Sequence, residues 1–262
     1  MRYGVCRGIT EYEDIKTIKE AGFDYVECGF CGLSRESDEV FESFKAALKK
    51  NNIKCEAANG FIPKDLPLIG DGYDKEKTAA YIENGMKRGA EIGLKVVVFG
   101  SGRAREVPEN VSYAEGFRQL GVFLNDVVSP LAEKYGITVA IEPLRMQECN
   151  IINTVKEGTM LAVLSGKDNI ACLADIYHML FANDTYDDIR QLKGSLKHAH
   201  ISNPTPADGS RRTYPASLDE YDYQGYIDAL NYAGCERCSV EAGCEDFATD
   251  AVLAGKLLKS LK

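Results

Sequence analysis

Ile137-Thr-Val-Ala-Ile-Glu142 is a short apolar run that ends in a carboxylate, and this pattern recurs along the chain. Three more such runs end in an ionisable residue: Ile170-Ala-Cys-Leu-Ala-Asp175, Leu196-Lys-His-Ala-His200 and Cys238-Ser-Val-Glu241. A short apolar run indicates a strand buried in a parallel sheet, whose last residue emerges at the rim. Because the carboxyl ends of parallel strands meet at one end of a barrel, we expect the four terminal residues to converge.

The rest of the chain repeats the same alternation of strand and helix. Strands are expected at residues 2–6, 23–28, 53–58, 94–99, 137–142, 170–175, 195–201 and 238–242. Amphipathic helical patterns lie between them, for example at residues 11–20, 38–50, 75–91, 113–134 and 223–232. This alternation predicts a parallel sheet with helical crossovers. The length of 262 residues is close to the roughly 250 residues typical of an eightfold β/α barrel.

The fold class that we expect is therefore α/β, a single (β/α)8 TIM barrel. No linker or change in composition divides the sequence, so we interpret residues 1–262 as one domain. Glycine stands between a helix and the next strand at four places: Gly22, Gly93, Gly136 and Gly234. Glycine relieves the strain of a left-handed helix end, and Asn51-Asn52 is expected to do the same before the third strand.

The composition excludes several classes of partner. The net charge of −9 and the lack of a basic cluster argue against nucleic acid. No apolar stretch is long enough for a signal peptide or a transmembrane helix, so we expect a cytoplasmic protein without a membrane partner. Nine cysteines indicate reduced thiols, and the motifs Cys28-Gly-Phe-Cys31 and Cys235-Glu-Arg-Cys238 are expected at opposite rims, which argues against shared zinc. The sequence leaves a homo-oligomer open.

The residues that end the last four strands predict a divalent-metal site. Three carboxylates and one imidazole would repel each other and would be costly to desolvate unless a cation lay between them. Oxygen-rich ligands with one imidazole favour Mn²⁺ or Mg²⁺ over a thiolate-type zinc site. One Mn²⁺ ion is therefore the cofactor that we expect first, with Mg²⁺, Co²⁺ or Zn²⁺ as alternatives.

Each of these residues also has a structural alternative. Glu142 could pair with Arg145, Asp175 could cap the helix that follows it, and Glu241 could be an ordinary rim carboxylate. Glu27 ends the second strand and is expected to contact a substrate hydroxyl or to form a rim salt bridge. Glu142, Asp175, His200 and Glu241 end four consecutive strands. This joint occurrence favours a shared metal site over a separate structural role for each residue.

The chain has only three histidines, and they cluster as Asp175-x-x-His178 and His198-x-His200. Residues two apart in a strand face the same side, so His198 and His200 are both expected inside the barrel. His200 is the outermost and the better ligand. His198 would lie one layer deeper, where a satisfied core histidine is an equal alternative.

Five segments together carry a family resemblance. They are V-F-G-S-G-R-A-R-E-V-P (98–108), I-E-P-L-R-M-Q-E-C-N-I-I-N-T (141–154), A-D-I-Y-H (174–178), H-A-H-I-S-N-P (198–204) and S-V-E-A (239–242). The chain resembles the xylose-isomerase-like barrel superfamily, and within it the D-tagatose 3-epimerase and sugar-phosphate isomerase/epimerase branch. The resemblance covers essentially the whole chain and is specific for fold and metal site, but not for substrate.

The resemblance implies roles for individual residues. Glu142, Asp175, His200 and Glu241 match the metal ligands, and Glu142 and Glu241 also match the acid/base pair. Three further residues match substrate contacts: His178, Glu148 and Arg212, with Arg211 as the alternative to Arg212. The branch often has Asn after Leu144, whereas this chain has Arg145, which places an extra cation near the site.

The implied activity is a metal-dependent isomerase or epimerase of a ketose or related small sugar, phosphorylated or not, that acts through an enediolate. Metal ions polarise carbonyls, and two carboxylates can remove and return a proton on opposite faces. The alternative on the same barrel is a metal-dependent dehydratase (lyase) of a polyol or keto-acid. An endonuclease for abasic DNA and a non-catalytic sugar-binding subunit are weaker readings. The loop 203–221 follows the seventh strand and is expected to cover the substrate.

Overall fold

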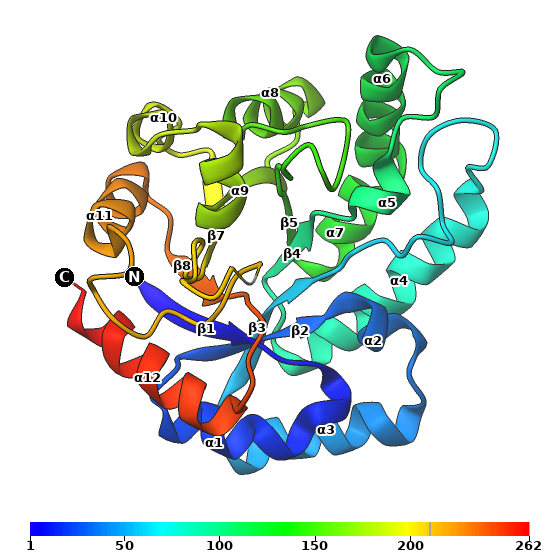
Figure 1. The fold of residues 1–262 in the computed structure, drawn as a ribbon. Coiled ribbons are helices and arrows are strands. Elements are labelled where there is room, and N and C mark those ends of the chain that lie inside the picture. The colour runs from blue at the N-terminus through cyan, green and yellow to red at the C-terminus, as the bar shows by residue number, and fades with distance from the viewer. Residues whose placement is uncertain (210, 262) are drawn as a thin grey trace.

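The computed structural model describes residues 1–209 and 211–261. Its eight parallel strands pair in sequence order and close into a barrel, with helices around the outside (Figure 1). This confirms the predicted TIM barrel. The strands are β1 (Arg2–Cys6), β2 (Tyr25–Gly29), β3 (Lys54–Asn59), β4 (Val96–Phe99), β5 (Thr138–Ile141), β6 (Ile170–Asp175), β7 (Leu196–Ile201) and β8 (Arg237–Val240).

The helices connect successive strands and cover the outer face of the barrel. Those of the first half are η1 (Ile9–Asp14), α1 (Ile15–Glu20), α2 (Phe30–Arg35), α3 (Asp38–Lys50), α4 (Lys75–Ile92) and α5 (Gly102–Arg105). Those of the second half are α6 (Tyr113–Phe123), η2 (Leu124–Val128), α7 (Ser129–Tyr135), α8 (Val155–Ser165), α9 (Ile176–Ala182), α10 (Tyr186–Gln191), α11 (Tyr223–Ala233) and α12 (Phe247–Ser260). No helix in residues 1–209 and 211–261 combines the length and the apolar character that a membrane span needs.

The predicted elements agree with the observed ones except at some of their ends. The helix expected at residues 113–134 is divided by η2, a turn of π-helix between α6 and α7. β5 and β8 end at Ile141 and Val240, so Glu142 and Glu241 are the first residues after their strands. Glu142 and Glu241 are therefore the first residues of loops at the rim, and their backbone is no longer part of the sheet.

Left-handed residues end several helices where the sequence predicts them. The four glycines between helix and strand have φ angles of 91° at Gly22, 94° at Gly93, 64° at Gly136 and 80° at Gly234. Before β3 the left-handed residue is Asn52, with φ 49°, and not Asn51. These turns return the chain to the amino end of the barrel, so the opposite rim is free to carry the polar loops.

The inner face of the barrel changes from apolar to polar toward its carboxyl end. Four buried residues of β4, β5 and β6 form a small apolar cluster: Val96, Val98, Ala140 and Leu173. Residues two positions further along these strands face the same side, which puts Glu142 above Ala140 and Asp175 above Leu173. Pairing of Asp175 with His200, and of His200 with Ser239, aligns the ends of β6, β7 and β8.

Candidate metal centre

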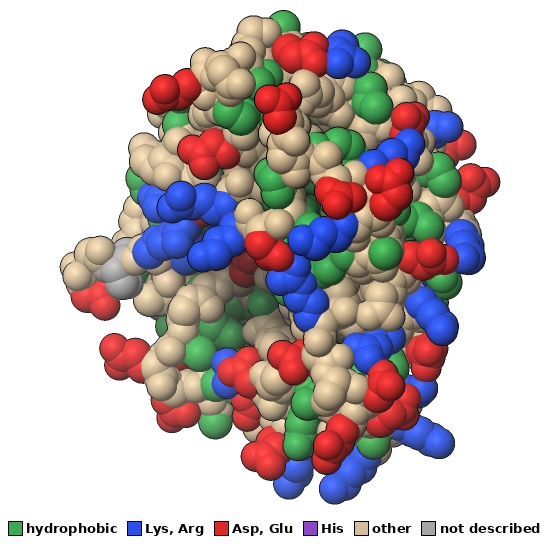
Figure 2. Space-filling model, turned by 90° about the vertical axis from the view of Figure 1, so that its right-hand side faces the viewer, with side chains coloured by type: hydrophobic (Ala, Val, Ile, Leu, Met, Phe, Trp, Pro, Cys, Tyr) green, Lys and Arg blue, Asp and Glu red, His purple; other side chains and the backbone are tan. Residues whose placement is uncertain are grey.

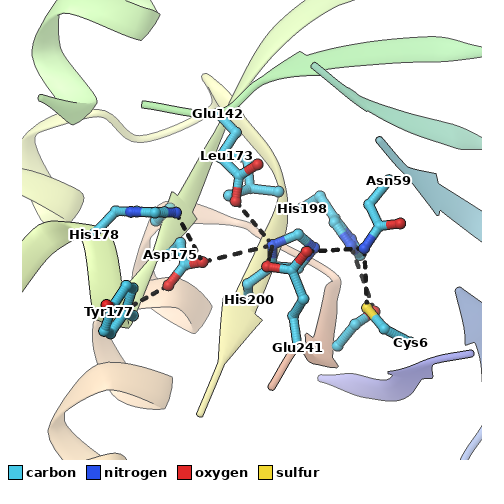
Figure 3. Close-up of polar contacts among 12 residues, drawn as sticks. Cys6, Asn59, Glu142, Leu173, Asp175, Tyr177, His178, His198, His200 and Glu241 are labelled. Atoms are coloured by element: carbon cyan, nitrogen blue, oxygen red, sulfur yellow. Dashed lines mark hydrogen bonds and ion pairs between the residues drawn. The ribbon is translucent and has the colours of Figure 1, made fainter. Parts of the chain in front are cut away.

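Four polar side chains converge at the carboxyl ends of β5 to β8 (Figure 3). Glu142, Asp175, His200 and Glu241 each offer one donor atom, and these atoms lie within 4.8 Å of one another. His200 Nδ1 is 3.0 Å from Glu142 Oε1, 3.2 Å from Glu241 Oε2 and 3.7 Å from Asp175 Oδ2. The four residues that the sequence singled out thus form one compact, largely buried group.

Asp175 has two separate functions in the fold. Its Oδ1 accepts a hydrogen bond of 2.7 Å from the backbone N–H of Tyr177 and caps α9. Its Oδ2 faces His200 and Arg212. The helix cap that was expected as an alternative to the metal site therefore exists together with the convergence. The cap fixes the carboxylate plane and leaves one oxygen for the centre.

Glu241 is held from two sides. Asn59, the last residue of β3, donates a 2.8 Å hydrogen bond to its Oε1. Arg212 donates a 2.8 Å hydrogen bond to its Oε2. Sequence reasoning missed Asn59, although it ends an apolar strand just as the four residues above do. Its neighbour Gly60 gives the segment the appearance of an ordinary turn.

Glu142 depends on the loop that follows β4. A Cβ atom at Gly100 would lie 2.2 Å from Glu142 Oε2, so only glycine leaves room for this carboxylate. The buried Arg105 donates hydrogen bonds of 2.8 Å to the carbonyl of Phe99 and 2.7 Å to the carbonyl of Glu142. These bonds join the ends of β4 and β5 where the carboxylate emerges.

The electrostatics of the centre differ between its carboxylates. Burial raises the pKa of Glu142, and the charge of Glu241 raises it further. Burial also opposes ionisation of Glu241, but the charges of His200 and Arg212 outweigh it and hold its pKa at about 2. Burial is likewise outweighed at Asp175, where His178 and Arg212 hold the pKa below its usual range. Glu241 and Asp175 are therefore ionised at neutral pH, and Glu142 accepts a proton more readily.

A divalent cation fits this set of donors. Three carboxylate oxygens and one imidazole nitrogen are ligands that Mn²⁺, Mg²⁺ and related ions accept. His200 Nε2 lies 2.9 Å from Glu27 Oε1, and a carboxylate there is an acceptor. When the imidazole is neutral, this contact assigns its proton to Nε2 and leaves the Nδ1 lone pair directed at the other three donors.

Glu27 lies one layer deeper than the sequence suggested. It is fully buried, and besides His200 it contacts His198, whose Nε2 is 2.7 Å from Glu27 Oε2. The rim salt bridge or substrate contact expected for it is therefore wrong. His198 lies below His200, also 3.4 Å from Ser239 Oγ, and is a core histidine. Both oxygens of Glu27 are close to imidazole nitrogens. Glu27, His198 and His200 thus form a second buried group of donors, whose atoms also lie within 4.8 Å of one another.

His178 borders the centre with a defined tautomer. Its Nδ1 accepts a 3.2 Å hydrogen bond from the backbone N–H of Arg145, which places the proton of the neutral ring on Nε2. That Nε2 is 3.9 Å from Asp175 Oδ2, too far for a hydrogen bond. The Nε2–H is therefore available to a ligand beside Asp175.

Arg212 enters the centre from the loop 203–221. Antiparallel pairing of Asn203 with Thr213, and pairing of Thr213 with Gly243, fold the described part of this loop back over β7 and β8. Arg212 Nη1 and Nη2 are each 2.8 Å from a carboxylate, Asp175 Oδ2 and Glu241 Oε2 respectively.

Arg211 and Glu148 lie at the edge of this group. Arg211 forms an ion pair with Glu148, and so does Arg145, at 2.7 Å. The neighbour of Arg145 is therefore Glu148 and not Glu142. Of the two candidate arginines, Arg212 contacts the convergent carboxylates and Arg211 does not.

The cysteine motifs do not form a metal site among the described residues. All nine cysteines have free thiols. Of the groups whose donor atoms lie close enough to share an ion in the described part of the chain, one contains a cysteine, Cys6, and none contains a member of either C-x-x-C motif.

Comparison with known proteins finds a family model that matches most of the chain, and several similar proteins that are named as sugar epimerases. Residues 15–262 match the family model described as "Xylose isomerase-like TIM barrel". The chain is 27% identical to the 3-dehydro-D-guloside 4-epimerase of Escherichia coli K12 over 82% of its length and 84% of the relative. It is 23% identical to the D-psicose 3-epimerase of Agrobacterium fabrum over 76% of its length and 72% of the relative. A solved D-psicose 3-epimerase of Clostridium cellulolyticum H10 with D-tagatose has a TM-score of 0.81, 17% identity, and coverage of 100% of this chain and 99% of that one.

Proposed function

The chain belongs to the xylose isomerase-like TIM barrel family, and we propose that it is a metal-dependent epimerase of a ketose sugar. The observation that carries the proposal is the convergence of Glu142, Asp175, His200 and Glu241 on one point at the carboxyl rim. Active sites of TIM-barrel enzymes lie at this rim. The names of the relatives, epimerases of D-psicose and of a keto-guloside, support a sugar with a carbonyl group.

Glu142 and Glu241 are the proposed acid/base pair. They directly follow β5 and β8, which are separated by the two strands β6 and β7, and both approach His200 Nδ1. A divalent ion held by the four residues would polarise the substrate carbonyl and stabilise the charge that develops on its oxygen. Glu241, ionised because of His200 and Arg212, takes the proton from the neighbouring carbon. Glu142 returns a proton to the opposite face, which inverts that carbon.

Two further side chains orient the substrate in this proposal. His178 donates its Nε2–H to a substrate hydroxyl, because Arg145 N–H already occupies Nδ1. Arg212 directs its guanidinium across Asp175 and Glu241, and donates to a substrate oxygen beside them. Glu148 is placed by Arg145 and Arg211 at the outer side of the site, where we propose that it accepts a hydrogen bond from the sugar.

The test is product analysis with a panel of ketoses. The purified chain is incubated with Mn²⁺ and each of several ketohexoses and ketopentoses, and products are separated by chromatography. We expect a stereoisomer of at least one ketose. A dehydrated enone in place of a stereoisomer would assign the chain to the dehydratases of this barrel. No conversion of any ketose, with metal bound, would contradict the proposed function.

Arg212→Ala is expected to raise the Michaelis constant by roughly 10–100-fold, because a charged hydrogen bond to substrate is lost. Steady-state kinetics with the ketose identified above measures this. Arg190→Ala is the matched control, since Arg190 pairs with Asp187 on the outer helix α10. If Arg211→Ala is defective and Arg212→Ala is not, the substrate contact belongs to Arg211. Unchanged kinetics for both would remove the loop 203–221 from the mechanism.

Glu27→Gln is expected to weaken Mn²⁺ binding by roughly 10–100-fold, the usual effect of losing a carboxylate behind a metal-ligating histidine. The carboxylate accepts from His200 Nε2 and so strengthens Nδ1 as a donor. Titration calorimetry with Mn²⁺ measures the affinity, and circular dichroism checks the fold. Glu20→Gln, an exposed carboxylate on α1, is the control. Wild-type Mn²⁺ affinity in a folded Glu27→Gln protein would contradict the support assigned to Glu27.

A further inference from the structure

Three arginines gather around one aromatic ring beside the proposed metal centre. The guanidinium carbons of Arg145 and Arg212 are each 5.0 Å from the centroid of the Tyr177 ring. The two carbons are therefore no more than about 10 Å apart, twice that distance. Arg211 joins the group through its ion pair with Glu148, which Arg145 shares. The face on which the loops after β3 and β4 lie is hollowed, and Lys and Arg side chains gather at one edge of the hollow (Figure 2).

The carboxylates are unevenly shared among these arginines, because two of the arginines pair with a single carboxylate. Arg212 is matched by Asp175 and Glu241, which also belong to the metal centre. Arg145 and Arg211 pair only with Glu148 among the salt bridges of the described residues. One carboxylate neutralises one of these two guanidinium groups and leaves an excess positive charge. The side chains of Arg145 and Glu148 are only 19% and 23% exposed, so water screens the charge at Arg145 incompletely, whereas Arg211 is 55% exposed at the outer edge of the group.

Arg145 is held in place before any ligand arrives. Its guanidinium carbon packs against the rings of Tyr177 and Phe181, 5.0 Å from each centroid, and the two rings are in contact with each other. Only its Nε donates to Glu148, and its two terminal nitrogens have no hydrogen-bond partner among the described residues. A guanidinium with free terminal nitrogens in a fixed plane is suited to bidentate binding of a carboxylate or phosphate. Its backbone N–H also fixes His178, so the group adjoins the reacting site.

We propose that Arg145 and Arg211 bind an anionic group of the substrate, a phosphate or a carboxylate, at a distance from its carbonyl. The inference rests on the proposed function and specifies its substrate as an anionic ketose. The carbonyl end lies at the metal centre beside Arg212, and the anionic end lies against Arg145 and Arg211. One arginine is enough to pair with Glu148. The second arginine then carries a positive charge, and a neutral sugar would leave that charge without a counter-ion.

The test compares three substrates that differ only at one end. They are a neutral ketohexose, its terminal phosphate ester and the corresponding keto-uronate, each assayed with Mn²⁺. We expect one of the two anionic substrates to have a kcat/KM at least tenfold above that of the neutral ketose. Whether this is the phosphate ester or the keto-uronate shows which anionic group the site binds. In Arg145→Ala the ratio of anionic to neutral kcat/KM should fall by roughly 10–100-fold, mainly through KM. Arg145→Lys keeps the positive charge but loses the two parallel N–H donors of the guanidinium. Its ratio of anionic to neutral kcat/KM should lie between those of the wild type and Arg145→Ala.

The control and a binding readout separate this inference from the proposed function. Arg118→Ala removes an arginine that pairs with Glu115 at the same three-residue spacing on the surface, and should leave the ratio unchanged. Calorimetry with a terminal phosphate or carboxylate of an unreactive alditol measures the anion site without turnover. The inference would be overturned if all three substrates were epimerised at the same rate, or if Arg145→Ala lowered kcat/KM equally for the anionic and the neutral substrates. Either result would leave the proposed function unaffected. Binding of the anionic alditol that needs Arg145, with no ketose converted, would support the anion site and contradict the function.

Discussion

Glu241→Gln is expected to keep the fold and to lose turnover by roughly 10²–10⁴-fold, the usual cost of removing a general base. The change preserves the shape of the side chain, and its amide oxygen can still face Asn59. It removes the negative charge of Glu241, which His200 and Arg212 stabilise; these two groups hold the pKa of Glu241 at about 2, so the carboxylate is ionised at neutral pH. Steady-state rates at saturating Mn²⁺ measure the loss.

The metal content of this variant must be measured beside its rate, because Glu241 is also a proposed ligand. Glu245→Gln provides the matched control, since Glu245 is an exposed carboxylate on the same loop. A Glu241→Gln protein that binds Mn²⁺ as the wild type does and reacts at a near-wild-type rate would show that the base is another group.

Removal of the divalent ion is expected to lower turnover by about 10³-fold or more, since Lewis-acid stabilisation contributes several kcal/mol and each 1.36 kcal/mol is a factor of ten. Chelation and dialysis should remove the activity, and Mn²⁺ should restore it. Elemental analysis of the restored protein should find one ion per chain. Asp175→Asn, which weakens the set of donors while retaining the oxygen that caps α9, should raise the Mn²⁺ concentration needed.

Activity that survives chelation in a protein without measurable metal would contradict this account of the centre. Thermal unfolding provides an independent readout. The apoprotein keeps carboxylates in contact with His200 and Arg212, so it should remain folded and gain stability on addition of Mn²⁺.

Local sequence was sufficient for the fold and for the convergence of the four donors. Each donor ends a short apolar run, and parallel strands place such ends together without knowledge of any tertiary contact. Asp175 shows why separate interpretations need not compete, because its two oxygens serve a helix cap and the centre at once. The ends of the strands were less predictable: Glu142 and Glu241 were expected within their strands, but they lie just after the last residues of β5 and β8.

The supporting contacts could not be predicted in the same way, because they join segments far apart in the chain. Asn59 and Glu241 are 182 positions apart, and Glu27 and His200 are 173 apart. Closure of the barrel brings β2 and β3 opposite β7 and β8, and no local pattern records that register. Arg105 was missed for a related reason, since its partners are backbone carbonyls that carry no sequence signal.

Deuterium incorporation from solvent tests the proposed mechanism most directly. The chain with Mn²⁺ and its ketose is incubated in D₂O, and the product is examined by NMR at the inverted carbon. We expect one deuterium at that carbon and none elsewhere, because the proton that Glu241 removes differs from the one that Glu142 returns. A stereoisomer formed with no deuterium at the inverted carbon would contradict proton exchange through these two carboxylates.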